Sequence, residues 1–369
     1  RPAAGGAPSP TSPPPPGGGG GPPRPPAPRV RLVDVAREAG LSKTTVSAAL
    51  NGTGRLSPAV REHARETARR LGYRPNATAR LLRAGHARLI GYAVGEHPTT
   101  PGSYMDSPYF AQLTSAVATA ALHHGYALVL LPTSSSPSEW ADLPLDAAII
   151  ADPLADDPLV EDFIAARVPL STDRSVEGRP GTHWVDIDTG TAVREVLDHL
   201  HAQGAQRIAV VAPDVPTRFY REALDVYRHW CAERKATPRI TRSERPGNGP
   251  VVEAVERALT SSAAPDALFV LAEANPPLVL DAARRLGLSV PGDLLLVCAS
   301  EDSSAAYADP PITTLSLQPH LIAATGVAQL IAALESGSQE PTGTVVPAKL
   351  ELRASSQRGR GPRGAAGPR

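Results

Sequence analysis

Cysteine, aromatic residues and lysine are all scarce in this chain of 369 residues. The two cysteines, Cys231 and Cys298, are too few for a disulfide framework or a structural zinc site, which excludes a small secreted scaffold. Aromatic residues make up only 4%, so the core must come from the aliphatic part of the 41% hydrophobic content. No apolar run reaches the roughly 18 residues of a membrane span, and the N-terminus lacks the apolar stretch of a signal peptide. These absences predict a cytoplasmic protein.

The formal net charge of zero conceals an uneven distribution. Residues 1–88 hold 15 Lys or Arg and 4 Asp or Glu, a balance of +11. Residues 353–369 add five Arg and no acid, so residues 89–352 carry −16. A basic N-terminal part on an acidic body indicates that this part binds a polyanion. The alternative is a basic, disordered tail that only aids solubility.

Both ends of the chain have the composition of disordered segments. Residues 1–28 contain twelve prolines and seven glycines and have almost nothing to bury. Residues 354–369 are similar and basic. We therefore expect disordered tails over 1–28 and 354–369.

Residues 29–75 predict three short helices. The first begins near Val33 and stops at Gly40, and Ser42 caps a second that reaches Leu50. The third starts at Ser57-Pro58, a cap followed by a proline. The expected core of this unit is Val33, Ala36, Val46, Leu50, Val60, Ala64, Ala68 and Leu71.

The spacing of Ala36, Gly40 and Val46 is that of a helix-turn-helix, with a small residue, a turn glycine and an apolar anchor. The second helix would then present polar side chains to the major groove of DNA, where base edges can be distinguished. These candidates are Ser42, Lys43, Thr44, Ser47 and Ala48. A helical hairpin used only for packing is the alternative.

From residue 89 onward, strands alternate with helices. Apolar runs predict buried parallel strands over Leu89–Val94, Ala127–Leu131, Ala147–Ala151, Ile208–Ala212, Ala267–Leu271 and Leu294–Ala299. Amphipathic stretches predict helices over Phe110–His124, Ala192–Gln203, Phe219–Lys235, Val251–Thr260 and Leu278–Leu286. The series is long enough for two doubly wound α/β lobes, with a ligand cleft between them.

Several motifs together resemble the lac repressor (LacI/GalR) family over roughly residues 30–353. In the N-terminal part these are Leu32–Gly40, Leu41–Ser47, Leu50-Asn51-Gly52 and Leu71–Ala77. In the core they are Leu89-Ile90-Gly91, Ser107-Pro108-Tyr109-Phe110, His124-Gly125-Tyr126, Asp173-Arg174, Val185–Asp188, Pro310–Thr314 and Gln318-Pro319.

The resemblance implies a domain order and a function. It implies a helix-turn-helix headpiece over 29–75, a hinge helix and linker over 76–88, and a periplasmic-binding-protein-like core over 89–353. Lobe one would span about 89–187 and 319–340, and lobe two about 188–318 and 341–353. A bacterial, cytoplasmic homodimer without membrane contacts is expected, bound at the nucleoid to a pseudo-palindromic operator as a repressor. Leucine heptads are not visible in the C-terminal part, so we do not expect a tetramer.

The resemblance also extends the DNA-binding set to Thr45, Asn51, Arg74 and Asn76. It implies that residues 76–83 form a hinge helix in the minor groove, where Leu82 would wedge into a base step. The alternative for Leu82 is a core position of the linker. Many members carry a base-reading arginine at the position of Ala48, which here offers only an apolar contact.

The implied effector site combines aromatic rings with polar groups. Tyr109 and Phe110 match pocket positions, and Asp173, Arg174 and Asp188 match polar positions near it. The alternatives are a buried aromatic pair and an ordinary surface turn. Three departures stand out: Ala272-Glu273 for a usual Asn-Asp, Ala299-Ser300-Glu301 for Gly-Phe-Asp, and Ala223 for an arginine. Glu273 and Glu301 remain as acceptors, with Arg218 and Arg221 as donors. These changes favour an atypical ligand, or none.

Other constellations are weak. The histidine pairs lack a third ligand at metal spacing, and neither a phosphate-binding glycine loop nor a Gly-x-Ser-x-Gly elbow follows a strand. We therefore expect no enzyme, metal or cofactor. A capping box at 136–139, cut short by Pro144, predicts a trimmed helix. Two alternatives stay open: a constitutive DNA-binding regulator, and a small-molecule sensor with a vestigial head.

Overall fold

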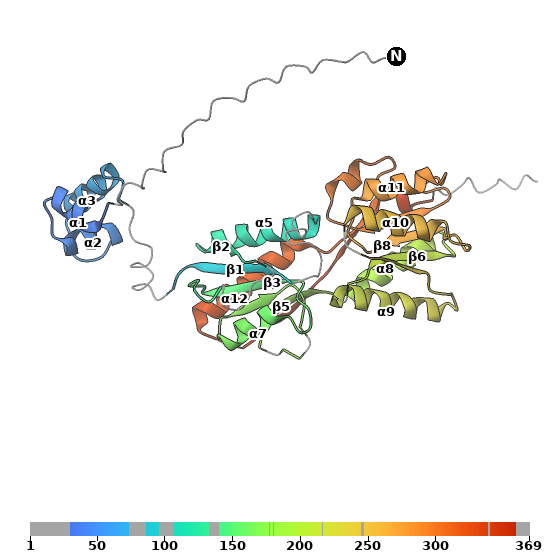
Figure 1. The fold of residues 1–369 in the computed structure, drawn as a ribbon, viewed down its shortest axis with the longest axis horizontal. Coiled ribbons are helices and arrows are strands. Elements are labelled where there is room, and N and C mark those ends of the chain that lie inside the picture. Colours follow the sequence, from blue (N-terminus) through green and yellow to red (C-terminus); the bar gives the residue numbers. More distant parts are fainter. Residues whose placement is uncertain are drawn as a thin grey trace, which may run out of the picture. The chain divides into compact units, whose positions relative to one another are not determined.

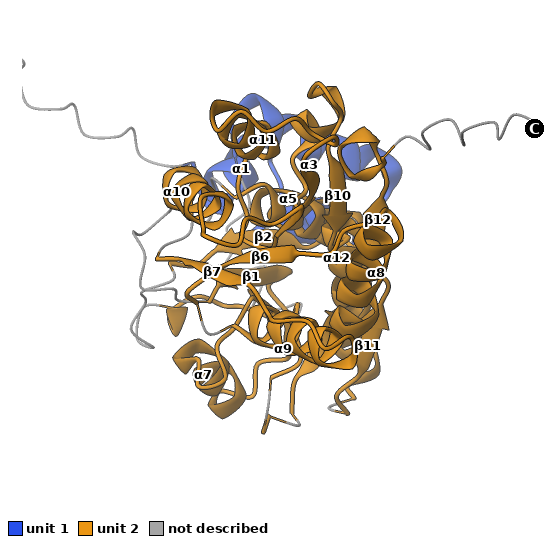
Figure 2. Ribbon diagram, turned by 90° about the vertical axis from the view of Figure 1, so that its right-hand side faces the viewer, with its two compact units in different colours: residues 1–85 blue, residues 86–369 orange. Residues whose placement is uncertain are grey.

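A computed structural model describes the fold of most of the chain. The described residues are 30–73, 86–95, 107–132, 140–176, 178–179, 181–215, 217–244, 247–338 and 340–358. The chain divides into two compact units, residues 1–85 and 86–369 (Figure 2). Outside the described residues lie the predictions for the N-terminal tail, the hinge helix, Arg74, Asn76, Leu82, the capping box at 136–139 and the tail beyond 358.

The first unit contains the three predicted helices, α1 (Leu32–Glu38), α2 (Lys43–Asn51) and α3 (Pro58–Arg70) (Figure 1). The predicted caps are confirmed. The Ser42 hydroxyl accepts the N–H of Thr45 at 3.0 Å, and the Ser57 hydroxyl accepts that of Val60 at 3.3 Å. Gly52 ends α2 in the left-handed conformation, which glycine adopts without a Cβ penalty.

Two predicted core positions of this unit, Val33 and Val60, differ from the structure. Val33 is 37% exposed, whereas its neighbour Val35 is fully buried. The reason is helical geometry: Val35, Ala36 and Ala39 share one face of α1, and Val33 lies away from it. The other expected core residues pack as predicted, with the exception of Val60, which is only partly buried and lies outside this cluster.

The second unit contains two mainly parallel sheets of the predicted α/β class. The first has the order β11-β5-β4-β3-β1-β2. Its strands are β1 (Leu89–Val94), β2 (Ala127–Leu130), β3 (Ala147–Ala151), β4 (Leu170–Thr172), β5 (His183–Ile187) and β11 (Gly343–Val346). The second has the order β12-β10-β9-β8-β6-β7. Its strands are β6 (Ile208–Pro213), β7 (Ile240–Ser243), β8 (Ala267–Val270), β9 (Leu295–Ala299), β10 (Thr313–Ser316) and β12 (Lys349–Glu351). Among the described strands, the β10–β12 pair alone is antiparallel.

Helices cover both faces of each sheet (Figure 1). Those of lobe one are α5 (Pro108–His123), α7 (Pro158–Ala165) and α12 (Pro319–Ser336). Those of lobe two are α8 (Thr189–Ala202), α9 (Arg218–Glu233), α10 (Asn248–Leu259) and α11 (Pro276–Arg285). Side chains alternate between the two faces of a strand, so in β6 Val210 packs on the side of α8 and α9, and Val211 on the side of α10 and α11.

Three of these helices begin with the same local signal, a capping residue followed by proline. Ser107, Asp157 and Asn275 accept the N–H groups of Phe110, Leu159 and Leu278 at the starts of α5, α7 and α11. Proline fits the first helical position because its missing N–H would have no intrahelical partner there. This signal fixes where α5 begins, and the start of α5 forms part of the site described below.

The predicted boundary of lobe two requires correction. The sequence-based division places residues 341–353 in this lobe, but β11 pairs with β5 in the sheet of lobe one. A Cβ built on Gly343 would overlap the Trp184 ring, so only glycine permits this close pairing. The chain therefore crosses between the lobes after β5, after β10 and again after β11, and only β12 returns to lobe two.

The predicted C-terminal tail starts too early. Residues 354–356 form a short 3₁₀ helix, and Ser355 and Ser356 are fully buried. The Ser355 hydroxyl donates to the carbonyl of Leu296 at 2.6 Å, and Ser356 Oγ lies 2.8 Å from His199 Nε2. Composition alone missed this because two small hydroxyl residues hold the segment through hydrogen bonds. No described helix is long and apolar enough to cross a membrane.

Candidate functional site

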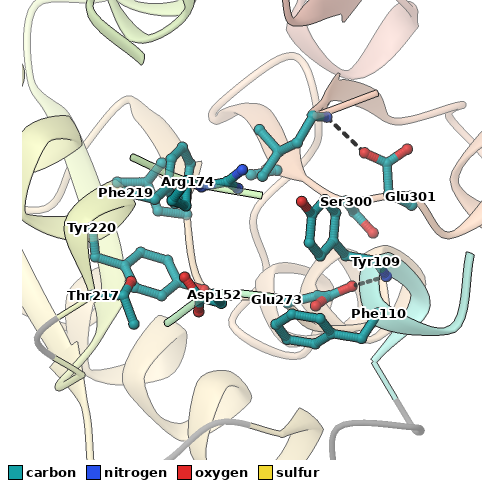
Figure 3. A pocket seen from close by; sticks show the side chains of 13 residues that line it. Tyr109, Phe110, Asp152, Arg174, Thr217, Phe219, Tyr220, Glu273, Ser300 and Glu301 are labelled. Atoms are coloured by element: carbon teal, nitrogen blue, oxygen red, sulfur yellow. Dashed lines mark hydrogen bonds between the residues drawn. The ribbon is translucent and has the colours of Figure 1, made fainter. Parts of the chain in front are cut away.

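A cleft between the lobes of the second unit contains about 500 Å³ of atom-free space, part of it open to solvent (Figure 3). Its residues come from the carboxyl ends of strands in both sheets and from the first turns of α5 and α9. This is where a doubly wound fold places a ligand. The lining residues are Tyr109, Phe110, Asp152, Arg174, Thr217, Phe219, Tyr220, Leu271, Glu273, Ala299, Ser300, Glu301 and Leu317.

Two aromatic pairs form apolar walls, one from each lobe. The rings of Tyr109 and Phe110 meet edge to face with centroids 5.2 Å apart, at the start of α5. Phe219 and Tyr220 make a similar pair at 5.2 Å, at the start of α9. Such pairs hold large rings in fixed orientations, so the walls are rigid surfaces for a flat or ring-shaped ligand.

A buried polar cluster lies behind the Tyr109 wall. The Tyr109 hydroxyl donates to Oδ2 of Asp173 at 2.9 Å, and the other carboxylate oxygen accepts the N–H of Asp152. Burial raises the pKa of Asp173 to about 6, although the Arg174 guanidinium opposes this rise. Burial also raises the pKa of Tyr109, so its hydroxyl keeps the proton that it donates.

Arg174 joins this cluster to the cleft. Its Nη1 lies 3.8 Å from Asp173 Oδ2, and its Nε lies 3.9 Å from Asp186 Oδ1. Its guanidinium carbon lies 5.7 Å from the Tyr109 ring centroid and 5.9 Å from that of Phe219, within the range of cation–π contact. Burial lowers the pKa of Arg174, but Tyr109 and the neighbouring carboxylates raise it above its usual value, so the side chain stays charged.

Glu273 crosses the cleft from lobe two to lobe one. It follows β8, and its Oε1 accepts the backbone N–H of Tyr109 at 2.7 Å (Figure 3). Its Oε2 accepts the Ser107 hydroxyl. Burial raises the pKa of Glu273, these two donors lower it, and the nearby charges of Glu301 and Asp302 raise it further.

Glu301 contacts the end of β10 and the segment that follows it, on the side of the cleft that belongs to lobe two. Its carboxylate accepts the Ser316 hydroxyl at 2.8 Å and the Leu317 N–H at 2.6 Å, where the chain passes from β10 to α12. The carbonyl of Glu301 accepts Nε2 of Gln112 from α5 at 2.7 Å. Glu301 therefore connects the hinge between the lobes to the first helix of lobe one.

The structure brings together five of the eight predicted effector residues on the cleft surface: Tyr109, Phe110, Arg174, Glu273 and Glu301. Asp173 lies directly behind them. Arg218 is not among the lining residues, because its Nε pairs with Glu222 at 2.7 Å and lies 3.7 Å from Asp186. Arg221 is exposed on α9 and does not line the cleft either.

Sequence reasoning did not single out six of the lining residues: Asp152, Thr217, Phe219, Tyr220, Leu271 and Leu317. Asp152 directly follows the apolar run of β3 and Leu271 follows β8, positions at the carboxyl ends of predicted strands. Their place directly after a strand could have identified these residues as candidates, because ligands bind at strand carboxyl ends in such sheets. Asp188, a further predicted polar position, instead caps α8 by accepting the N–H of Thr191 at 2.9 Å.

A second candidate surface is the outer face of α2 in the first unit. Val46 and Ala49 are buried against α1 and α3, which turns the opposite face toward solvent. Ser42, Lys43, Thr44 and Asn51 are exposed, while Thr45, Ser47 and Ala48 are partly exposed. All seven predicted α2 positions are therefore accessible. Ser42 Oγ also contacts Thr45 Oγ1 at 2.7 Å, so both hydroxyls already have a partner within the helix.

Two family models match parts of the chain. Residues 31–76 match the family described as bacterial regulatory proteins, lacI family, and residues 197–356 match a periplasmic binding protein-like domain. The chain therefore carries a LacI-family DNA-binding domain followed by a periplasmic-binding-protein-like domain. The resemblance predicted from its motifs is confirmed.

Relatives and solved structures align over most of the chain. Catabolite control protein A of Staphylococcus xylosus is 23% identical, covering 89% of this chain and 99% of that protein. The transcriptional regulator CelR of Thermobifida fusca is 26% identical, covering 89% and 98%. A lac repressor dimer bound to operator and an anti-inducer shares the fold with a TM-score of 0.77, 23% identity, and coverage of 89% and 100%. A CelR–cellobiose complex aligns with a TM-score of 0.64 and 24% identity, covering 89% of this chain and 100% of that chain.

Proposed function

We propose that this protein is a dimeric LacI-family repressor whose operator affinity is set by a small molecule bound between its lobes. The observation that carries the proposal is the combination of two surfaces in one chain. The headpiece exposes a polar helix face, and the core has a cleft with aromatic walls and acceptor groups. A sensor with a vestigial head would not need the exposed face of α2.

On the DNA side, α2 enters the major groove with its outer face. Lys43 supplies N–H donors, and Asn51 keeps one amide N–H besides the one that it donates to Ser47 Oγ at 3.3 Å. Ala48 offers a methyl group for contact with thymine. Arg74, Asn76 and Leu82 extend the contact toward the phosphates and the minor groove, as the family resemblance implies.

On the ligand side, the cleft favours a molecule that donates hydrogen bonds. Asp152, Glu273 and Glu301 present carboxylates, which accept when ionised. The ring pairs of Tyr109 and Tyr220 with their phenylalanine neighbours suit an apolar ring face. A sugar combines hydroxyl donors with such a face, and the solved CelR structure is a complex with the sugar cellobiose.

Coupling between the two surfaces requires that the ligand bind one arrangement of the lobes better than another. The contacts of Glu273 with α5, of Gln112 with Glu301, and of Arg218 with Ser175 all join lobe one to lobe two. A ligand in the cleft touches the first two of these places and shifts their balance.

The dimer is proposed to form through exposed apolar side chains of lobe one. Leu122 on α5 is 64% exposed and Leu130 on β2 is 51% exposed, and β2 is the edge strand of its sheet. Exposed apolar groups on an edge strand favour a protein partner. A two-fold dimer suits a pseudo-palindromic operator.

The proposal is tested with an operator selected from random duplex DNA by the purified protein. Fluorescence anisotropy then gives the affinity and the stoichiometry, for the wild type and for a chain lacking residues 29–83. We expect two chains per site and loss of selective binding on deletion. Selective binding that survives the deletion contradicts the proposal. Thermal unfolding against sugars, sugar phosphates, nucleosides and nucleobases tests the cleft, since a ligand at a hundred times its Kd adds about 2.7 kcal/mol.

A regulator without an effector is the second candidate. One observation favours it: a side chain of lobe two already bridges the cleft, through the Glu273 contact with the start of α5. In this case no compound of the panel raises the unfolding temperature, while operator binding persists.

A further inference from the structure

The start of α5 is the place where lobe one offers hydrogen-bond donors to the cleft. The first N–H groups of any helix have no partner within the helix and lie at the positive end of its dipole. In α5, a helix of 16 residues, Ser107 caps the N–H of Phe110, and the N–H of Tyr109 points to the other side of the cleft. A ligand with an acceptor oxygen could satisfy this group.

The group that satisfies it is a carboxylate of lobe two. Glu273 accepts from both the Tyr109 N–H and the Ser107 hydroxyl, with one oxygen for each. Among the described residues, no arginine or lysine forms an ion pair with Glu273. The contact across the cleft therefore supplies the stabilisation that this partly buried charge receives from the protein.

A second hydrogen bond joins α5 to lobe two close to the Glu273 contact. Gln112 lies one turn further along the helix, and its amide donates to the carbonyl of Glu301 at 2.7 Å. The two contacts join the first turn and a half of α5 to the ends of β8 and β9. They occupy one side of the cleft, while Arg218 and Ser175 join the lobes elsewhere.

We propose that Glu273, with Ser107 and Tyr109, is an interlobe latch that holds the cleft closed when no ligand is bound. The carboxylate takes the place that a bound molecule would fill between the lobes. A ligand that donates hydrogen bonds to Glu273 competes with α5 for the same oxygens and releases the latch. This regulation rests on the proposed function, because release matters only in a protein whose lobes control a second site.

Reach and acceptor character are the two properties that the latch requires. Aspartate keeps the charge but is one methylene shorter, so E273D should lose both hydrogen bonds. Glutamine keeps the length, and its amide can accept from the Tyr109 N–H and pair with Ser107, so E273Q should keep the latch. Alanine removes it. Because burial raises the pKa of Glu273, the neutral glutamine also avoids the penalty of a buried charge.

The test measures the distance between the lobes in the full-length, ligand-free protein. Spin labels are placed on S115C in α5 and S262C beyond α10, two exposed positions, whereas the native Cys231 and Cys298 are buried. We expect one narrow distance distribution for the wild type and for E273Q. We expect a longer or broader distribution for E273A and E273D. E253A, at an exposed glutamate of α10, is the matched control and should equal the wild type.

Three results overturn the latch: a broad distribution in the wild type, E273A and E273D distributions equal to that of the wild type, or an open E273Q. S107A tests the same contact from lobe one and should shift the distribution partway toward E273A. If E273A does not fold, the distance distributions of E273D and S107A test the latch in its place. Operator binding is measured on the same samples. A wild-type protein that fails to bind DNA contradicts the proposed function, while the distance distributions still test the latch independently.

Discussion

Tyr109 and Asp173 connect the wall of the cleft to its buried base. The Tyr109 hydroxyl donates to Asp173 Oδ2 at 2.9 Å, and the ring of the same residue faces the cleft beside Phe110. The backbone N–H of Tyr109 binds Glu273 of the other lobe at 2.7 Å. One residue therefore joins the ligand surface, the Asp173–Arg174 cluster and the contact between the lobes.

Replacing Tyr109 by phenylalanine tests the first of these connections. The Y109F variant keeps the ring and the backbone contact but removes a donor from a buried carboxylate. The free energy of unfolding should fall by about 1–3 kcal/mol, because a buried acceptor loses its partner. Denaturant unfolding measures the change. Y307F is the matched control, since Tyr307 is 88% exposed, and it should leave stability unchanged. Equal stabilities of the two variants contradict the role of the hydroxyl.

His183 should make the protein less stable in mild acid. Burial lowers its pKa from 6.5, and its Nδ1 accepts the N–H of Thr342 at 3.1 Å, which a protonated ring cannot do. The unfolded chain then binds the proton more tightly, so the free energy of unfolding is fully present above about pH 6.5 and falls as the pH drops through the lowered pKa. Asparagine can still accept from Thr342 but does not titrate.

The H183N variant should therefore lose part of this acid sensitivity. Urea unfolding at pH 5 and pH 7.5 measures it, and the difference between the two pH values should be smaller than in the wild type. His199, whose pKa burial also lowers, retains its own share. The exposed His123 supplies the control, since H123Q should keep the wild-type pH dependence. A difference that H183N leaves unchanged excludes His183 as a source of acid sensitivity.

Elements with a strong local signal could be predicted from the sequence. The apolar run of β3 and the cap-plus-proline start of α3 agree with the observed bounds. Short strands with polar residues escape such prediction: β4 has three residues, and β7 has the sequence Ile-Thr-Arg-Ser at the edge of its sheet. Their formation depends on a neighbouring strand and not on their own composition.

The candidate site could be predicted only in part, for a related reason. Motif positions placed Tyr109 and Glu273 near a pocket, but not in contact with each other, because 164 residues separate them along the chain. The directions of Arg218 and Arg221 depend on which face of α9 meets the core. Phe219 takes the buried position, and Arg218 pairs with acids beside the cleft. Such choices arise from tertiary packing.

The cap of α2 makes a prediction for the DNA-binding unit. The Ser42 hydroxyl accepts the Thr45 N–H at 3.0 Å. Alanine at this position should destabilise the helix start by about 0.5–2 kcal/mol, which is a roughly 2- to 30-fold faster hydrogen exchange of the Thr45 amide. Mass spectrometry or NMR of the full chain measures the rate. S42D keeps an acceptor and should restore protection, while the same rate in all three proteins contradicts the cap.

Leu82 offers a test of how the protein distinguishes its operator from other DNA. The family resemblance implies that this side chain enters a base step from the minor groove. Unstacking the step costs a few kcal/mol, which the added contact offsets only at a deformable site. L82A should weaken binding to the selected operator by at least about tenfold, or roughly 1.4 kcal/mol. Binding to unrelated duplex should stay unchanged, because that affinity comes from phosphate contacts. L81A, at the preceding leucine, serves as the control, and equal losses on both DNAs for L82A contradict the wedge.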